Sequence, residues 1–113
     1  MTTNPLPPTL REKNRYLVLR IISKTKFEKK AVQRVLWNSA FNFLGERGVS
    51  KISLWFVDWD EKKQRGIVKV NRQSVEDIRA SIALISKIEG EKVIPQILGI
   101  SGTIKGARRK WMC

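Results

Sequence analysis

The chain has 113 residues, with 23 lysines and arginines against 10 aspartates and glutamates, so its formal charge is +13. This length predicts one domain with a single core, and an apolar fraction of 42% is typical of a chain that folds. The charge favours a polyanionic partner, nucleic acid before an anionic membrane surface, although a protein can also be merely basic. The lack of histidine excludes His-based acid–base catalysis and the usual zinc ligand sets.

The single cysteine, Cys113, permits no internal disulfide, which is compatible with a reducing compartment. No apolar run approaches the roughly 20 residues that a membrane-spanning helix needs, and no signal peptide is expected ahead of the fold. These features predict a cytoplasmic protein without a membrane partner.

The first half of the chain predicts an arm, a strand and a helix. Residues 1–14 form a basic arm whose prolines disfavour helix. Residues 15–22 are apolar almost without a break, which is typical of a buried strand. The stretch 25–28 has the spacing of a capping box, so a helix is expected to begin there and to end at Gly45 and Gly48. Its apolar face would contain Val32, Val35, Leu36, Ala40, Phe43 and Leu44.

The second half predicts two strands, a helix and a last strand. Residues 51–58 alternate between the faces of a strand, and a polar loop leads into a strand over 65–71. Ser74 is a suitable N-cap for a helix that Gly90 would stop. A strand over 92–100 and a basic tail follow. The apolar residues at helical spacing in this helix are Val75, Ile78, Ile82 and Ile85.

The order βαββαβ predicts an α+β, ferredoxin-like fold, as in RNA-recognition motifs, with a four-stranded antiparallel sheet and helices on one face. The domain is expected over 15–101, with the arm at 1–14 and a basic C-terminal tail at 102–113. Right-handed crossovers are expected to pair the first and third strands in parallel, with the first strand internal and beside the last.

Strand alternation separates two faces. Leu17, Leu19 and Ile21 would lie under the helices, with Tyr16, Val18 and Arg20 on the open face. A single bulge in strand 51–58 would reverse that strand's contribution. The open face would present Tyr16, Val18, Arg20, Trp55, Val57, Arg65, Ile67 and Lys69.

An open face of this composition is too apolar to stay hydrated, so a protein partner or a second copy is expected to cover it. The residues predicted at this partner interface are Tyr16, Val18, Trp55, Val57 and Ile67. Base stacking, as in an RNA-recognition motif, is disfavoured because the segment 65–70 contains no aromatic ring. A structural role for Trp55 and Trp59 stays open.

Candidate chemistry is sparse. Asp58 and Asp60 would point to the same side of a strand end and could share a magnesium ion, but two carboxylates at a hairpin are ordinary. No glycine-rich loop has the spacing that cradles phosphates. We therefore predict neither a catalytic residue nor a metal site in the chain.

The cations cluster at the two ends of the sequence, which would share a surface if the first and last strands are neighbours. Contacts of these cations with phosphates would make binding strongly salt-dependent, although a charged tail can also be merely hydrated. The residues predicted to bind RNA are Arg11, Lys13, Arg15, Arg20, Lys105, Arg108, Arg109 and Lys110.

Three stretches resemble the archaeal ribonuclease P protein component 2 family, which has eukaryotic relatives in ribonuclease P and the mitochondrial RNA processing ribonuclease. They are LPPTLREKNRYLVLRI at 6–21, GVSKISLWFVDWDEKKQRGIVKVN at 48–71 and LGISGTIKGARRK at 98–110. The elements Arg15-Tyr16 and Ser101-Gly102-Thr103-Ile104, followed by Lys105, are the most specific.

The resemblance implies a non-catalytic subunit of the ribonucleoprotein that removes 5′ leaders from precursor tRNA. The RNA would hold the active site, with magnesium expected there and no cofactor bound by the chain. Ribonuclease P RNA and ribonuclease P protein component 3 would be its partners, precursor tRNA would be met indirectly, and self-association stays open. Alternatives are a generic basic RNA-binding or ribosomal protein and an acylphosphatase-type hydrolase. Whether the tail is helical stays open too.

Overall fold

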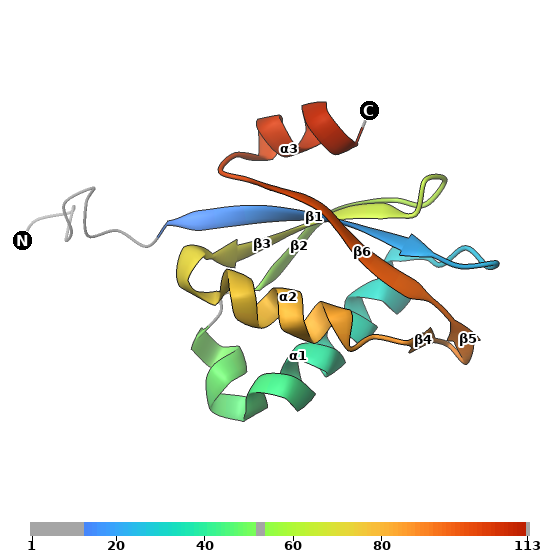
Figure 1. The fold of residues 1–113 in the computed structure, drawn as a ribbon, viewed down its shortest axis with the longest axis horizontal. Coiled ribbons are helices and arrows are strands. Elements are labelled where there is room, and N and C mark those ends of the chain that lie inside the picture. The colour runs from blue at the N-terminus through green and yellow to red at the C-terminus, as the bar shows by residue number, and fades with distance from the viewer. Residues whose placement is uncertain (1–12, 52–53, 113) are drawn as a thin grey trace, which may run out of the picture.

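The computed structural model in Figure 1 describes residues 13–51 and 54–112. Arg11, most of the arm predicted over 1–14, residues 52–53 of a predicted strand and Cys113 lie outside the described residues. The elements in chain order are β1 (Asn14–Ile22), α1 (Lys29–Lys51), β2 (Trp55–Asp60), β3 (Arg65–Asn71), the 3-10 helix η2 (Arg72–Ser74), α2 (Val75–Ala83), β4 (Lys87–Ile88), β5 (Glu91–Lys92), β6 (Ile94–Ser101) and α3 (Ile104–Trp111).

The main sheet has four strands in the order β2-β3-β1-β6, all antiparallel, with α1 and α2 together on one face (Figure 1). This confirms the predicted α+β, ferredoxin-like fold, with the first strand internal and beside the last. The expected parallel pairing of the first and third strands is wrong, because β1 and β3 run antiparallel. The crossover through α1 makes β2 parallel to β1, and the tight turn after β2 then reverses the chain into β3.

Alternation along β1 sorts its side chains as predicted. Leu17, Leu19 and Ile21 are buried in the main core, together with apolar residues of α1 and α2. Val18 belongs to a second apolar cluster, on the opposite face of the sheet. The sheet is therefore apolar at its centre on both sides, which requires a cover on both.

A bulge in β2 exchanges the sheet faces to which the side chains in the second half of the strand point. Phe56 pairs with Val68 and Asp58 with Ile67, so Val57 is the extra residue. Trp59 consequently packs against the main core, while Asp58 turns to the other face. A strand without the bulge would have placed these two side chains the other way round.

The helix start predicted at 25–28 is wrong, since α1 begins at Lys29. The reason lies at Phe27, which is buried and held by long-range hydrogen bonds. Its N–H donates to Oε1 of Gln64 at 2.9 Å. Its carbonyl accepts from Nε2 of Gln64 at 3.1 Å and from Nε1 of Trp59 at 3.0 Å. These contacts keep the segment before Lys29 out of the helix.

The end of α1 is marked by Gly45, as predicted, but helical structure resumes beyond it. Gly45 has φ 75° and ψ 176°, which breaks the helix, and the chain is helical again as far as Lys51. The strand expected from residue 51 therefore begins only at Trp55. Phe43, predicted on the buried face, is 46% exposed, whereas its neighbour Leu44 packs against the core.

The second helix is shorter than predicted. It ends at Ala83, and Gly90 instead lies in the turn of a small hairpin formed by β4 and β5. Glu89 and Gly90 have φ values of 50° and 81°, the pair of positive values that a tight hairpin turn requires. Ile85 is buried as expected, but from the segment between α2 and the hairpin rather than from the helix.

The basic tail forms a helix, α3, on the opposite side of the sheet from α1 and α2 (Figure 1). It contacts β6 and β1. The expectation of helices on one face therefore holds for the first two helices only, and the face predicted to be open has a cover supplied by the chain itself.

Candidate nucleic-acid interface

The third helix begins where the sequence supplies a capping residue. Thr103 is its N-cap, and its Oγ1 accepts a hydrogen bond from the backbone N–H of Gly106 at 3.0 Å. The Oγ of Ser101 accepts from the N–H of Thr103 at 3.2 Å, so the last residue of β6 also shapes the turn into the helix. The Ser-Gly-Thr segment therefore sets where α3 leaves the sheet.

An apolar side of α3 packs onto the sheet. Ala107 is fully buried against Val18 and Ile67, and Trp111 and Met112 pack beside them. The ring of Trp111 lies over Gly99, where a Cβ atom would collide with it. Glycine in the middle of β6 thus makes the close approach of the helix possible.

The carboxyl end of α3 is held by Arg65 at the start of β3. Nη1 of Arg65 donates to the carbonyl of Trp111 at 2.9 Å. The last carbonyls of a helix have no partner within the helix and carry partial negative charge, so a guanidinium there is favourable. Arg65 is therefore a positioning residue for α3.

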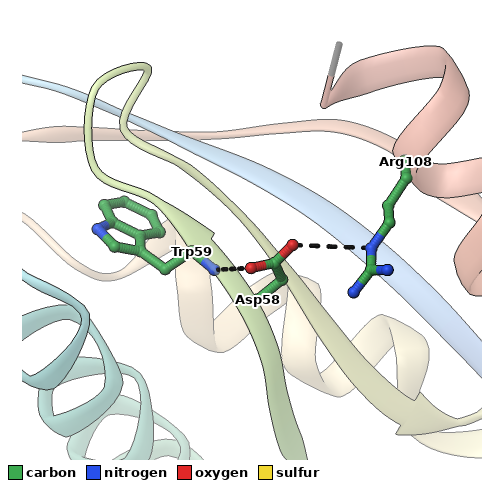
Figure 2. A network of polar contacts seen from close by, with 3 residues as sticks. All are labelled: Asp58, Trp59 and Arg108. Carbon is green, nitrogen blue, oxygen red and sulfur yellow. Dashed lines mark hydrogen bonds and ion pairs between the residues drawn. The ribbon is translucent and has the colours of Figure 1, made fainter.

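Asp58 forms an ion pair with one of the helix's cations. Figure 2 shows Asp58 reaching toward Arg108, with its Oδ2 3.7 Å from Nε of Arg108. Its Oδ1 accepts from the backbone N–H of Trp59 at 2.9 Å, while the Trp59 ring turns away from both. The side chains of Arg108 and Asp58 are 55% and 42% exposed, so the pair contributes at most about 1 kcal/mol. Arg108 is thereby directed from α3 toward β2.

The other cations of α3 are directed to solvent. Lys105, Arg109 and Lys110 are all exposed. Nζ of Lys110 lies 5.6 Å from the centre of the Trp111 ring, a cation–π contact. With its apolar side on the sheet, α3 presents a basic outer surface suited to phosphate groups.

The cations predicted in the first strand are not gathered on one surface. Arg20 is exposed on the α3 face and pairs across the strands with Arg65, which bonds the helix end. Arg15 is opposite Val70 and by alternation belongs to the other face, where its Nη1 donates to the carbonyl of Asn14 at 2.9 Å. Lys13 is exposed just before β1. That these cations bind RNA stays a prediction.

The residues predicted at a partner interface differ in exposure. Val18 and Ile67 are fully buried beneath α3, and Tyr16 and Val57 are half-buried beside the same cluster. Trp55 is 65% exposed. The centre of the predicted interface is therefore covered by the protein's own helix, which the sequence interpretation did not include.

The carboxylates considered for magnesium have local partners. Asp58 accepts from the N–H of Trp59 and pairs with Arg108. Oδ1 of Asp60 accepts from the N–H groups of Lys62 and Lys63 in the turn at 3.1 and 3.2 Å. Within the ranges 13–51 and 54–112, no three His, Cys, Asp or Glu side chains come close enough to hold a metal ion. No helix within the same ranges is long and apolar enough to cross a membrane.

Sequence reasoning did not assign Gly99 to this site, and it placed Arg65 on the open face without giving it a role. A glycine inside a strand signals close approach of another group, so Gly99 could have been singled out. The role of Arg65 depends on where α3 ends in space, and no local pattern shows that.

The fold and the helix on its sheet define a ferredoxin-like α+β domain that carries a basic amphipathic helix. The family model described as the Rpp14/Pop5 family matches residues 15–112, and the chain belongs to that family. The chain is 44% identical to ribonuclease P protein component 2 of Thermococcus gammatolerans and 42% identical to that of Pyrococcus furiosus. Each match spans 107 residues, which are 95% of this chain and 89% of the relative.

A solved structure of yeast ribonuclease MRP contains a chain with the same fold. The TM-score is 0.68 at 17% sequence identity, and the match covers 90% of this chain and 87% of the yeast chain. At that identity the likeness supports the fold alone.

Proposed function

We propose that the chain is a protein subunit of ribonuclease P, which binds the catalytic RNA and supports its removal of 5′ leaders from precursor tRNA. The observation that carries this proposal is the match to relatives named ribonuclease P protein component 2 along 95% of the chain. The basic outer surface of α3 supports the RNA-binding part, because phosphate contacts supply most of the affinity of such proteins.

In this proposal the RNA carries the active site with magnesium, and the chain contributes no catalytic group and no cofactor site. Precursor tRNA would be met through the RNA, in the cytoplasm. The hydrogen bonds and the ion pair of Asp58 and Asp60 support a structural role for both carboxylates.

Ribonuclease P protein component 3 is the protein partner that we propose, with a second copy of the chain as the alternative. Apolar side chains exposed on α1 support a protein contact on the side away from α3. Trp37, Phe41 and Phe43 are 36%, 50% and 46% exposed. These residues lie outside the interface that the sequence predicted.

The test is cleavage of precursor tRNA by the catalytic RNA at limiting magnesium, with and without the chain, and with component 3 present or absent. We expect cleavage to be restored only when both proteins are added. If both proteins are folded, the RNA is active at high magnesium and neither protein changes its rate, the proposal fails. A generic basic RNA-binding domain would then be the remaining description.

A further inference from the structure

The exposed ring of Trp55 belongs to a row of side chains that crosses three strands. Trp55, the first residue of β2, pairs with Lys69 of β3, and Lys69 pairs with Tyr16 of β1. Directly paired residues of antiparallel strands direct their side chains to the same face. All three therefore lie on the face that α3 partly covers, with Tyr16 packing against the second apolar cluster.

Helix α3 covers the neighbouring row and not the end of this one. Val18 and Ile67, the next cross-strand pair on the same face, are fully buried with Ala107 of the helix. Trp55 in contrast is 65% exposed, on the edge strand of the sheet. The centre of the sheet is thus closed to a ligand, while the Trp55 end is open.

The charges around this row suit a polyanion. Lys69 stands between the two aromatic rings, and neither Trp55 nor Tyr16 has a carboxylate for a cross-strand partner. Asp58, the next acidic residue along β2, is already engaged by Arg108. Two exposed lysines lie near the Tyr16 end of the row. Lys13 comes shortly before Tyr16 in the chain, and Lys105 comes shortly after Ser101, the β6 partner of Tyr16. An aromatic face beside lysines matches a nucleobase attached to a phosphate.

We infer that Trp55 is a stacking site for an unpaired nucleobase of RNA, with Lys69 contacting the adjoining phosphate. The inference rests on the proposed function, because it assumes that RNA is the partner. Neighbouring strands are about 4.8 Å apart, so Trp55 and Tyr16 are separated by about 10 Å with the lysine between them. That spacing leaves room for one base on Trp55 and its phosphate over Lys69. Stacking needs no aromatic residue on β3 in this arrangement.

The experiment measures binding of the full chain to a labelled single-stranded RNA oligonucleotide and to a duplex of the same length, over a range of salt concentrations. Trp55→Ala should weaken single-strand binding by about 5- to 150-fold and leave its salt dependence unchanged. Trp55→Phe should retain most of the affinity, whereas Trp55→Leu, which keeps apolar bulk without a π-face, should not. Lys69→Ala should lower the salt slope of single-strand binding by about 0.7.

Trp37→Ala is the matched control, since Trp37 is also partly exposed but lies on α1, across the sheet from α3. Equal affinities of Trp55→Ala and Trp37→Ala for single-stranded RNA would overturn the inference. So would equal affinities of Trp55→Phe and Trp55→Leu, or a wild-type chain that binds no single strand.

A protein contact is the competing explanation for an exposed tryptophan. If Trp55→Ala loses binding to component 3 and keeps its RNA affinity, the surface belongs to a protein and the inference is wrong. The proposed function would survive that outcome, because it is tested separately by stimulation of precursor tRNA cleavage by the wild-type chain.

Discussion

Two glycines in the sheet each leave space for a tryptophan ring, and the two rings lie on opposite faces. A Cβ atom on Gly66 would lie 2.7 Å from Cε3 of Trp59, and one on Gly99 would collide with the ring of Trp111. The first contact seats Trp59 near the core, where its Nε1 reaches the carbonyl of Phe27. The second lets α3 approach the sheet. Glycine here is a packing requirement, since neither residue has a positive φ.

Gly99→Ala should therefore loosen α3. The added methyl group displaces the Trp111 ring, and overpacking of this kind costs about 1–3 kcal/mol. Urea unfolding followed by circular dichroism measures the loss. Gly102→Ala is the control, because a Cβ at that position has nothing within 4 Å. Equal stabilities of the two variants would show that the ring does not pack on Gly99.

Gln64 joins the turn between β2 and β3 to the segment before α1 through its side chain. It is 7% exposed and bonds both backbone groups of Phe27 as well as the carbonyl of Glu61 at 2.6 Å. Gln64→Ala leaves the N–H of Phe27 buried without its acceptor, so the free energy of unfolding should fall by about 1–3 kcal/mol. Differential scanning calorimetry is a suitable measurement.

Glu89→Ala is the control for backbone strain, because Glu89 also has a positive φ, 50° against 55° for Gln64, but is exposed. Any strain that alanine adds is then shared by both variants. If the two lose the same stability, the hydrogen bonds of Gln64 contribute nothing measurable.

At the scale of the elements, α3 begins with a side-chain cap, whereas the N-cap residue of α2 makes no such hydrogen bond. Thr103→Ala removes the acceptor for the N–H of Gly106 and should destabilise the protein by about 0.5–2 kcal/mol. Hydrogen exchange should rise first in α3, because the lost acceptor serves an N–H in the first turn of that helix. Thr25→Ala tests the alternative cap that sequence spacing suggests. It should be close to neutral, since Thr25 is exposed and α1 begins four residues later. A larger effect at position 25 than at 103 would contradict this assignment.

The strands show how far sequence patterns predict this fold. The faces of β1 and β3 follow from alternation, because their pairing has no register shift and Leu17, Leu19 and Ile21 occupy one face of β1 in succession. In β2 the bulge at Val57 breaks the alternation, and nothing in the sequence fixes its position. Because of the bulge, Asp58 pairs with Arg108 and Trp59 packs against the core. The positions of these two side chains therefore could not be predicted from the local sequence.

The helices were less predictable for two different reasons. Ile85 continues the helical spacing of α2, but the helix ends at Ala83 and Ile85 is buried from the segment that leads into the hairpin. The positive φ values of Glu89 and Gly90 belong to a tight turn and not to a longer helix. The tail did contain a helical signal, a cap at Thr103 followed by apolar residues at Ile104, Ala107 and Trp111. Such a short basic segment is not stable alone, and its helix forms through packing on the sheet.

At the scale of the whole molecule, we predict that RNA binding depends more on where the positive charge lies than on its total. The exposed cations Arg109 and Lys110 lie on the basic surface of α3, whereas Lys87 and Lys92 are paired and exposed in the β4–β5 hairpin, away from that helix (Figure 1). Replacing either pair by alanine lowers the net charge equally. A purely long-range attraction would respond alike to both changes.

The Arg109→Ala/Lys110→Ala variant should reduce the slope of log affinity against log salt by about 1.4–1.8, as expected for the loss of two phosphate contacts. The Lys87→Ala/Lys92→Ala variant should leave the slope within error of wild type. Titration of the catalytic RNA at several salt concentrations measures both. If the slope of log affinity against log salt falls by the same amount in both variants, the RNA responds to total charge and α3 is not its contact surface. If only the hairpin variant changes, the contact surface lies at the opposite side of the sheet, with α1 and α2.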